Sequence, residues 1–131
     1  MKVLFISYYF EPFPGVGAKR VSYWVNNCAK YGIEPTVLTA TAQVEKNGHI
    51  HYLPIQKKSN VLHYFIKDPG LDWKKSLLDY LKNLQEFNFD FVLISGGPFM
   101  HFEVTKYLKK KFNAKVLLDF RDPYSNNPSF K

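Results

Sequence analysis

The chain has 131 residues, a length that suits one domain rather than two. Hydrophobic residues make up 46% of it, which supports a packed core and argues against disorder. The net charge of +7 favours anionic partners, namely phosphorylated ligands, nucleic acid or an anionic membrane surface. Because Cys28 is the single cysteine, an intrachain disulfide is excluded, which fits a reducing compartment.

The sequence predicts neither a signal peptide nor a membrane span. The apolar run at residues 2–7 is too short for a signal peptide, and no small-residue cleavage site follows it. No stretch reaches the roughly 20 apolar residues that cross a bilayer. We therefore expect a cytoplasmic protein, whose contact with the inner membrane face, where one exists, is peripheral.

In chain order, the first half predicts a strand, a helix and two more strands. Residues 2–7 are almost continuously apolar, as in a strand buried on both faces. After a loop at residues 8–17, a helix is expected from residue 18 to a stop at Gly32. Its inner face would carry Val21, Trp24, Val25 and Cys28. Residues 35–40 predict a second strand and residues 48–54 a short third one.

The second half predicts a helix, a strand, a helix and a strand. The first helix would span residues 72–87, with Asp72 as its N-cap. Its apolar stripe is Trp73, Leu77, Leu78, Leu81 and Leu84. A fourth strand is expected at residues 89–94, a third helix at 99–112 and a fifth strand at 114–120. The inner candidates of the third helix are Phe102, Val104, Tyr107 and Leu108.

Strands that alternate with helices indicate a parallel sheet with right-handed connections. We therefore predict an α/β fold: one Rossmann-like, three-layer domain over residues 1–131, with a parallel sheet of about five strands. Such sheets bind ligands beyond the carboxyl ends of their strands. The loops that leave those ends are residues 8–17, 95–98 and 121–127.

The first of these loops has the composition of a phosphate-binding turn. Gly15 and Gly17 allow the backbone to approach a ligand, and the following helix directs its free N–H groups and positive dipole end there. Arg20 adds positive charge. A sharp strand-to-helix turn that needs glycine is the structural alternative.

Two common nucleotide-binding motifs do not fit this loop. A dinucleotide fingerprint requires a third glycine where Arg20 stands and an acidic residue after the second strand, where residues 39–41 read Thr-Ala-Thr. The GxxxxGK[ST] pattern of a P-loop does not occur. An NAD-dependent oxidoreductase and a P-loop NTPase are therefore disfavoured.

The second loop, Ser95, Gly96 and Gly97 before Pro98, also opens onto a helix. Its glycines again permit a ligand to approach, so all three residues are candidates for substrate binding. His101 lies one turn into that helix and is a candidate catalytic group, the alternative being a structural histidine.

The third loop places two carboxylates around an arginine at the end of a strand. Asp119 is a candidate for substrate binding, Arg121 for holding a phosphate or carboxylate, and Asp122 for a general base or for binding sugar hydroxyls. A structural ion pair that caps the next element is the alternative.

Other polar residues predict less. His49, His51 and His63 lack a convincing set of metal-ligand partners, so no metal site is expected. A lysine-rich set reads either as a solvated helix face or as a contact with anionic lipid. This set comprises Lys57, Lys58, Lys74, Lys75, Lys106, Lys109, Lys110 and Lys111. No nucleic-acid motif occurs, so a nucleic-acid adaptor is disfavoured.

Three segments, SYYFEPFPGVGAKR, SGGPF with its following histidine, and LLDFRDPY, together resemble the amino-terminal domain of family 4 GT-B glycosyltransferases. The resemblance covers residues 2–128, and its specificity comes from the pairing of the early glycine loop with the late DFRDP motif. Pro14 replaces a common glycine and Tyr124 a common tryptophan. Arg121 and Asp122 fill the region where many members carry a catalytic histidine, which leaves the catalytic group open.

This resemblance implies an acceptor-binding domain that works with a carboxyl-terminal domain not contained in the chain. The second domain would hold most of a nucleotide-sugar donor, and the pair would transfer its sugar with retention and without metal or cofactor to a polysaccharide or glycolipid acceptor. Gly15 and Gly17 would lie near the donor diphosphate, with Arg121 and Asp122 beside the acceptor or the transferred sugar. Alone, the chain would be inactive. A stand-alone Rossmann-like module that binds a phosphorylated ligand is the alternative function.

Overall fold

The computed structural model describes residues 1–41, 46–56 and 67–120. Its sheet has six strands in the order β3-β4-β2-β1-β5-β6. The strands are β1 (Lys2–Ser7), β2 (Glu34–Thr41), β3 (Lys46–Asn47), β4 (Ile50–Pro54), β5 (Phe91–Ser95) and β6 (Val116–Asp119). Every neighbouring pair is parallel except β3 and β4, which pair antiparallel over two residues. The five longer strands therefore form the predicted parallel sheet, and the short β3 adds an edge hairpin that was not predicted.

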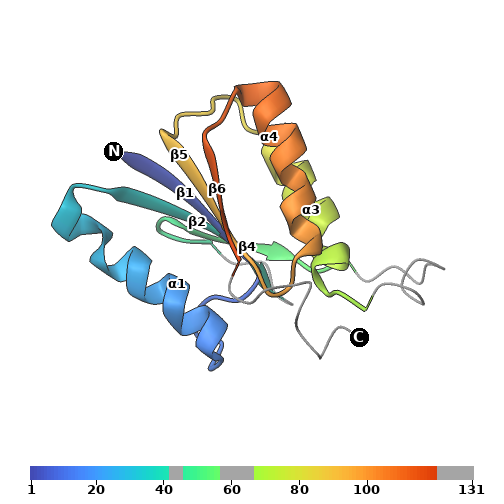
Figure 1. The fold of residues 1–131 in the computed structure, drawn as a ribbon, viewed down its shortest axis with the longest axis horizontal. Coiled ribbons are helices and arrows are strands. Elements are labelled where there is room, and N and C mark those ends of the chain that lie inside the picture. Colours follow the sequence, from blue (N-terminus) through green and yellow to red (C-terminus); the bar gives the residue numbers. More distant parts are fainter. Residues whose placement is uncertain (42–45, 57–66, 121–131) are drawn as a thin grey trace.

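Helices cover both faces of this sheet (Figure 1). They are α1 (Val16–Asn27) with its 3₁₀ continuation η1 (Cys28–Tyr31), α3 (Gly70–Lys82), η2 (Met100–Glu103) and α4 (Val104–Phe112). In Figure 1, α1 lies on one side of the strands and α3 and α4 lie together on the other. This arrangement confirms the predicted three-layer α/β architecture.

The central strand β1 is buried on both faces, as its unbroken apolar sequence predicts. Val3 and Phe5 pack with α1, whereas Leu4 and Ile6 pack with α3 and α4. Because successive side chains of a strand point to opposite faces, one apolar run supplies two separate cores. The register of β1 with both β2 and β5 is thereby fixed, since a slip of one residue would exchange the two faces.

The helices bury the faces that their periodicity predicts. Val21, Val25 and Cys28 lie in the core on the α1 side. On the opposite side, Trp73, Leu77, Leu81, Val104 and Leu108 are completely buried. Glycine 32 ends η1 in the left-handed conformation, with φ at +66°, as expected of a helix stop.

Three details of the second half differ from expectation. Helix α3 begins at Gly70 with Pro69 in the N-cap position, so Asp72 lies in its first turn and is not its N-cap. The helix also ends at Lys82 rather than at residue 87, although Leu84 still packs against the core from the loop beyond. The predicted third helix is divided into η2 and α4. In the described residues, no helix has the length and apolar character needed to cross a membrane.

Candidate functional site

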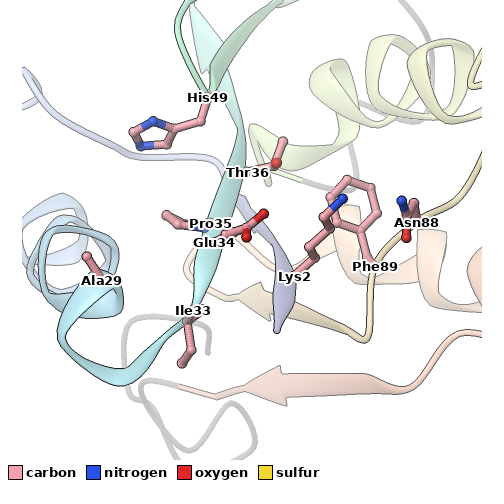
Figure 2. Close-up of a pocket in the computed structure, with 9 residues that line it drawn as sticks. All are labelled: Lys2, Ala29, Ile33, Glu34, Pro35, Thr36, His49, Asn88 and Phe89. Atoms are coloured by element: carbon pink, nitrogen blue, oxygen red, sulfur yellow. The ribbon is translucent and has the colours of Figure 1, made fainter.

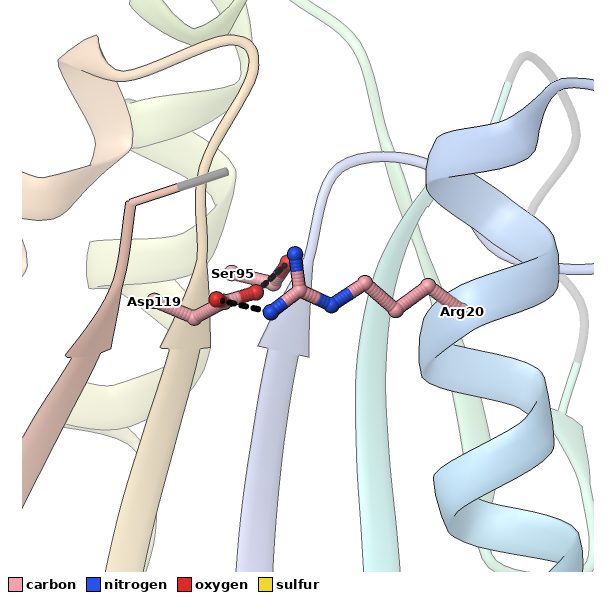
Figure 3. A network of polar contacts seen from close by, with 3 residues as sticks. All are labelled: Arg20, Ser95 and Asp119. Atoms are coloured by element: carbon pink, nitrogen blue, oxygen red, sulfur yellow. Dashed lines mark hydrogen bonds and ion pairs between the residues drawn. The ribbon is translucent and has the colours of Figure 1, made fainter. Parts of the chain in front are cut away.

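Three of the predicted site residues meet at the carboxyl edge of the sheet, where β1, β5 and β6 end (Figure 3). Arg20, on α1, reaches across β1 and places its Nη2 2.6 Å from Oδ1 of Asp119, the last residue of β6. The hydroxyl of Ser95, at the end of β5, donates to the other oxygen of Asp119 at 2.9 Å. The carboxylate of Asp119 thus links the ends of β5 and β6 to helix α1.

This network is more enclosed at the carboxylate than at the guanidinium. The side chain of Asp119 is 14% exposed and that of Arg20 is 39% exposed. The guanidinium also lies over the ring of Trp24, 4.7 Å from its centroid, in cation–π geometry. In this arrangement Arg20 is committed to Asp119 and Trp24, so the structure gives it a role in shaping the edge of the sheet.

Packing or backbone conformation explains why each of these two positions in the second loop is a glycine. Gly97 has φ at +78°, a conformation that other residues rarely adopt. A side chain on Gly96 would overlap the rings of Phe99 and Phe102. The amide of Gly96 donates to the carbonyl of Asp119 at 3.0 Å. These glycines were expected to leave space for a ligand. At Gly96, aromatic side chains of the protein itself fill that space.

His101 is completely buried behind this loop, which supports the structural histidine of the two alternatives and not the catalytic candidate. Its Nε2 lies 3.0 Å from the carbonyl oxygen of Ser95, and its ring packs against that of Trp73 with centroids 5.3 Å apart. Since a carbonyl only accepts, Nε2 carries the proton. Burial lowers the pKa of His101 to about 4, outweighing the opposing effects of the Ser95 bond and of Asp68. A neutral histidine that holds Ser95 in place is the role that these contacts support.

Asp68 is a functional candidate that the sequence analysis missed. One of its oxygens accepts from the amide of Gly70 at 2.8 Å, and the other accepts from the amides of Phe99 at 2.8 Å and Met100 at 3.3 Å. The carboxylate therefore joins the start of α3 to the loop after β5. A lone aspartate ahead of a Pro-Gly pair is a common turn composition, and no sequence pattern relates it to a loop 31 residues away.

In the described residues, the amino end of α1 has no side-chain cap. Gly15 is its N-cap and makes no side-chain capping bond, Gly17 lies in the first turn, and no acidic residue is present there. Lys19 is exposed in the same turn region. Uncapped N–H groups together with the helix dipole favour negative charge at this position.

Two small hollows flank the side chain of Phe13 in the first loop. Each has a volume of about 270 Å³. One, between the ends of β1, β2 and β4, is lined by Tyr8, Tyr9, Phe10, Phe13, Ala40 and Ile55. The other, between the first loop and α1, is lined by Glu11, Phe13, Lys19, Ser22, Tyr23 and Asn26. A mainly aromatic hollow and a mainly polar hollow thus share one lining residue, Phe13.

A larger open hollow, of about 630 Å³, lies at the opposite end of the sheet (Figure 2). Its lining residues include Lys2 and Glu34, which begin β1 and β2, and Phe89, which precedes β5. Parallel sheets place their ligand sites at the carboxyl ends of strands, and this hollow is at the amino ends. It also gathers none of the predicted site residues. We therefore assign the candidate site to the edge that carries Arg20, Ser95 and Asp119, despite the smaller hollows there.

Several predicted residues fall outside the described part of the chain. Arg121 and Asp122 lie in the range 121–131, and Lys57, Lys58 and His63 lie in the range 57–66. Among the described lysines, Lys74 pairs with Glu103 at 2.6 Å and Lys75 with Asp79 at 2.9 Å. Lys106, Lys109, Lys110 and Lys111 are exposed on α4. Within the described ranges, no three His, Cys, Asp or Glu side chains gather as metal ligands would.

Comparison with models of protein families matches none of them, and a search of curated proteins finds no match either.

Proposed function

We propose that the chain is the acceptor-binding, amino-terminal domain of a retaining GT-B glycosyltransferase that acts on a polysaccharide or glycolipid in the cytoplasm. The observation that carries the proposal is the junction of Arg20, Ser95 and Asp119. Each comes from one of the three segments that resemble family 4 enzymes. Their meeting at one sheet edge supports reading those segments as one site rather than as three unrelated matches.

The free end of α1 supports a donor diphosphate at this edge. Its N-terminal amides have no side-chain cap, and the first turn holds no acid that would repel a phosphate. Lys19 supplies a nearby cation, whereas Arg20 is held by Asp119. Gly15 and Gly17 would then be the backbone that approaches the diphosphate, with nucleotide-sugar as a substrate and no cofactor.

Exposed apolar side chains at the same edge support a partner domain. Phe13 and Val16 lie at the start of α1, and Phe120 follows the end of β6; all three are exposed. Large apolar side chains exposed on one edge favour contact with another protein surface. A second domain that closes over this edge would cover it and complete the donor site, which is why the chain by itself would not transfer sugar.

Sugar transfer by the full-length protein tests the proposal. The protein carrying both domains is incubated with radiolabelled UDP-glucose or GDP-mannose and a membrane extract that supplies acceptors. We expect label in polysaccharide or glycolipid, and a large loss of that label in Arg121→Ala and Asp122→Ala. Tyr31→Ala, at an exposed site beyond the far end of α1, serves as the control.

Two outcomes count against the proposal. Unchanged transfer in both variants would remove Arg121 and Asp122 from the site. No transfer from any nucleotide-sugar, combined with tight binding of inorganic pyrophosphate by the chain alone, would favour a stand-alone module that binds a phosphorylated ligand.

A further inference from the structure

The side chain of Phe13 is held in an exposed position by its neighbours. Its ring stacks on that of Tyr9, with centroids 4.4 Å apart and an angle of 25° between the planes, and 47% of the residue remains exposed. A Cβ on Gly15 would lie 2.5 Å from Cε1 of Phe13, so the ring occupies space that only a glycine leaves open. An aromatic ring that is stacked on one face and open to solvent elsewhere is available for a ligand.

The loop that carries this ring is fixed at several points. The carbonyl of Tyr8 accepts from the hydroxyl of Thr39 at 3.2 Å, and that of Tyr9 accepts from the hydroxyl of Ser7 at 2.7 Å. The Tyr52 hydroxyl donates to the carbonyl of Glu11 at 3.2 Å. Because these bonds order the loop before any ligand arrives, less entropy is lost on binding.

The two hollows beside Phe13 differ in chemistry. The first is lined by the aromatic residues Tyr8, Tyr9 and Phe10 together with two aliphatic residues. In the second, Glu11 offers carboxylate acceptors, Asn26 an amide that both donates and accepts, and Lys19 an ammonium donor. Burial raises the pKa of Tyr8 to about 12, so its hydroxyl keeps its proton and can also donate.

A pyranose ring has this same division of chemistry. Its C–H groups form an apolar face with partial positive charge, which is attracted to the negative face of an aromatic ring. Its hydroxyls lie around the rim and pair with carboxylates and amides. A lipid chain would leave the polar hollow unsatisfied, and a free phosphate would gain nothing from the aromatic one. We propose that Phe13 and its two hollows bind a pyranose ring of the acceptor.

The identification of this sugar as the acceptor rests on the proposed function. The binding of a sugar at Phe13 can be measured without any sugar transfer. Amide chemical shifts of the full chain are followed by NMR during titration with methyl β-D-glucopyranoside and methyl α-D-mannopyranoside. We expect saturable shifts at Tyr9, Phe13 and Asn26 with at least one glycoside. Sorbitol, which has hydroxyls but no rigid apolar face, is expected to give none.

Variants identify the ring that binds. Phe13→Ala is expected to weaken binding about tenfold, equivalent to about 1.4 kcal/mol, because it removes the aromatic face against which the sugar packs. Gly15→Ala should weaken binding as well, because its methyl group displaces the Phe13 ring while the bulk of the fold is untouched. Glu11→Gln tests whether the Glu11 carboxylate contributes to glycoside binding. Tyr31→Ala, an equally aromatic residue that is 78% exposed, is the matched control and should bind like the parent.

Saturable shifts that survive Phe13→Ala, or no shifts with either glycoside, would overturn the inference. Shifts at the same amides with geraniol in place of glycosides would assign the site to a lipid and would also contradict it. Glycoside binding by a protein whose full-length form transfers no sugar would keep this site and reject the glycosyltransferase. Sugar transfer without glycoside binding would support the glycosyltransferase and reject this binding site.

Discussion

At the scale of single residues, His101 illustrates how burial changes the role of a reactive side chain. Its pKa of about 4 lies below the ordinary value of 6.5, so the ring is neutral in the folded protein at physiological pH. In the unfolded chain it would take up a proton at about its ordinary pKa. The unfolded state therefore binds more protons than the folded state between these two values, and folding stability must fall as the pH is lowered through that range.

We expect this histidine to contribute a loss of about 2 kcal/mol in unfolding free energy between about pH 7 and about pH 5. His101→Gln keeps a side-chain N–H for the Ser95 carbonyl and cannot titrate, so its stability should fall less over the same range. Urea unfolding of both proteins at each pH measures the difference, and carboxylates that titrate in both cancel from it. Equal pH dependence in the two proteins would show that His101 does not titrate as its burial requires.

The sequence predicts that His101 lies one turn after the glycine loop, but it does not predict that the side chain is buried. A histidine near a strand end is compatible with a catalytic or a structural role, and the choice depends on what packs against the ring. Trp73, which packs against it, comes from a helix far away in the chain. By contrast, the network of Arg20, Ser95 and Asp119 was partly predictable, because parallel strands and the helix between them bring their loops to one edge.

At the scale of elements, Asp68 links α3 to the loop after β5 by accepting from three backbone amides. Asp68→Ala leaves these amides without that acceptor, and we expect it to lower the unfolding free energy by about 1–3 kcal/mol. Asp68→Asn retains one carbonyl oxygen and should lose less. Urea unfolding measures both variants.

Asp79→Ala is the matched control for this prediction. Asp79 lies on α3 and pairs with Lys75 in an exposed i,i+4 geometry, so its removal should cost about 0.3–0.5 kcal/mol. Equal losses for Asp68→Ala and Asp79→Ala would mean that the two elements are not held together by Asp68.

Element types were predictable, whereas some of their ends were not. Apolar periodicity extends through Leu84, yet α3 ends at Lys82, because a loop residue can pack inward as well as a helical one. The division into the 3₁₀ helix η2 and the α-helix α4 depends on local backbone geometry. The spacing of apolar residues in the sequence does not predict it. The two-residue β3 is too short to give an alternating pattern.

At the scale of the whole molecule, β6 ends the sheet on the side away from β4 and carries unusual apolar exposure. Leu117 is 56% exposed and Leu118 40%. In the described residues, β6 pairs with β5 alone and so forms one edge of the described sheet. Exposed apolar strands at a sheet edge promote association with other chains. This strand and its two leucines therefore form a surface suited to association with another protein chain.

We expect the isolated chain to self-associate through this edge. Sedimentation velocity over a range of concentrations should reveal association, and Leu117→Lys should reduce it while changing unfolding free energy by only about 0.5 kcal/mol. Tyr31→Lys, at another exposed apolar position, should leave association unchanged. A chain that stays monomeric at every concentration, or associates equally in both variants, would exclude β6 as the contact.

The central position of β1 also determines when it can be completed during folding. Its pairing with β2 joins Lys2 to Glu34, but its pairing with β5 joins Val3 to Phe91, and the Lys2 amide bonds to Asp90 across 88 residues. On the ribosome, β1, α1, β2 and β4 emerge long before β5. One side of β1 therefore waits unpaired until β5 has been synthesised, and closing that long loop is a slow step for a topology rich in distant contacts. The strand at the centre of the finished sheet is, until β5 emerges, an open edge.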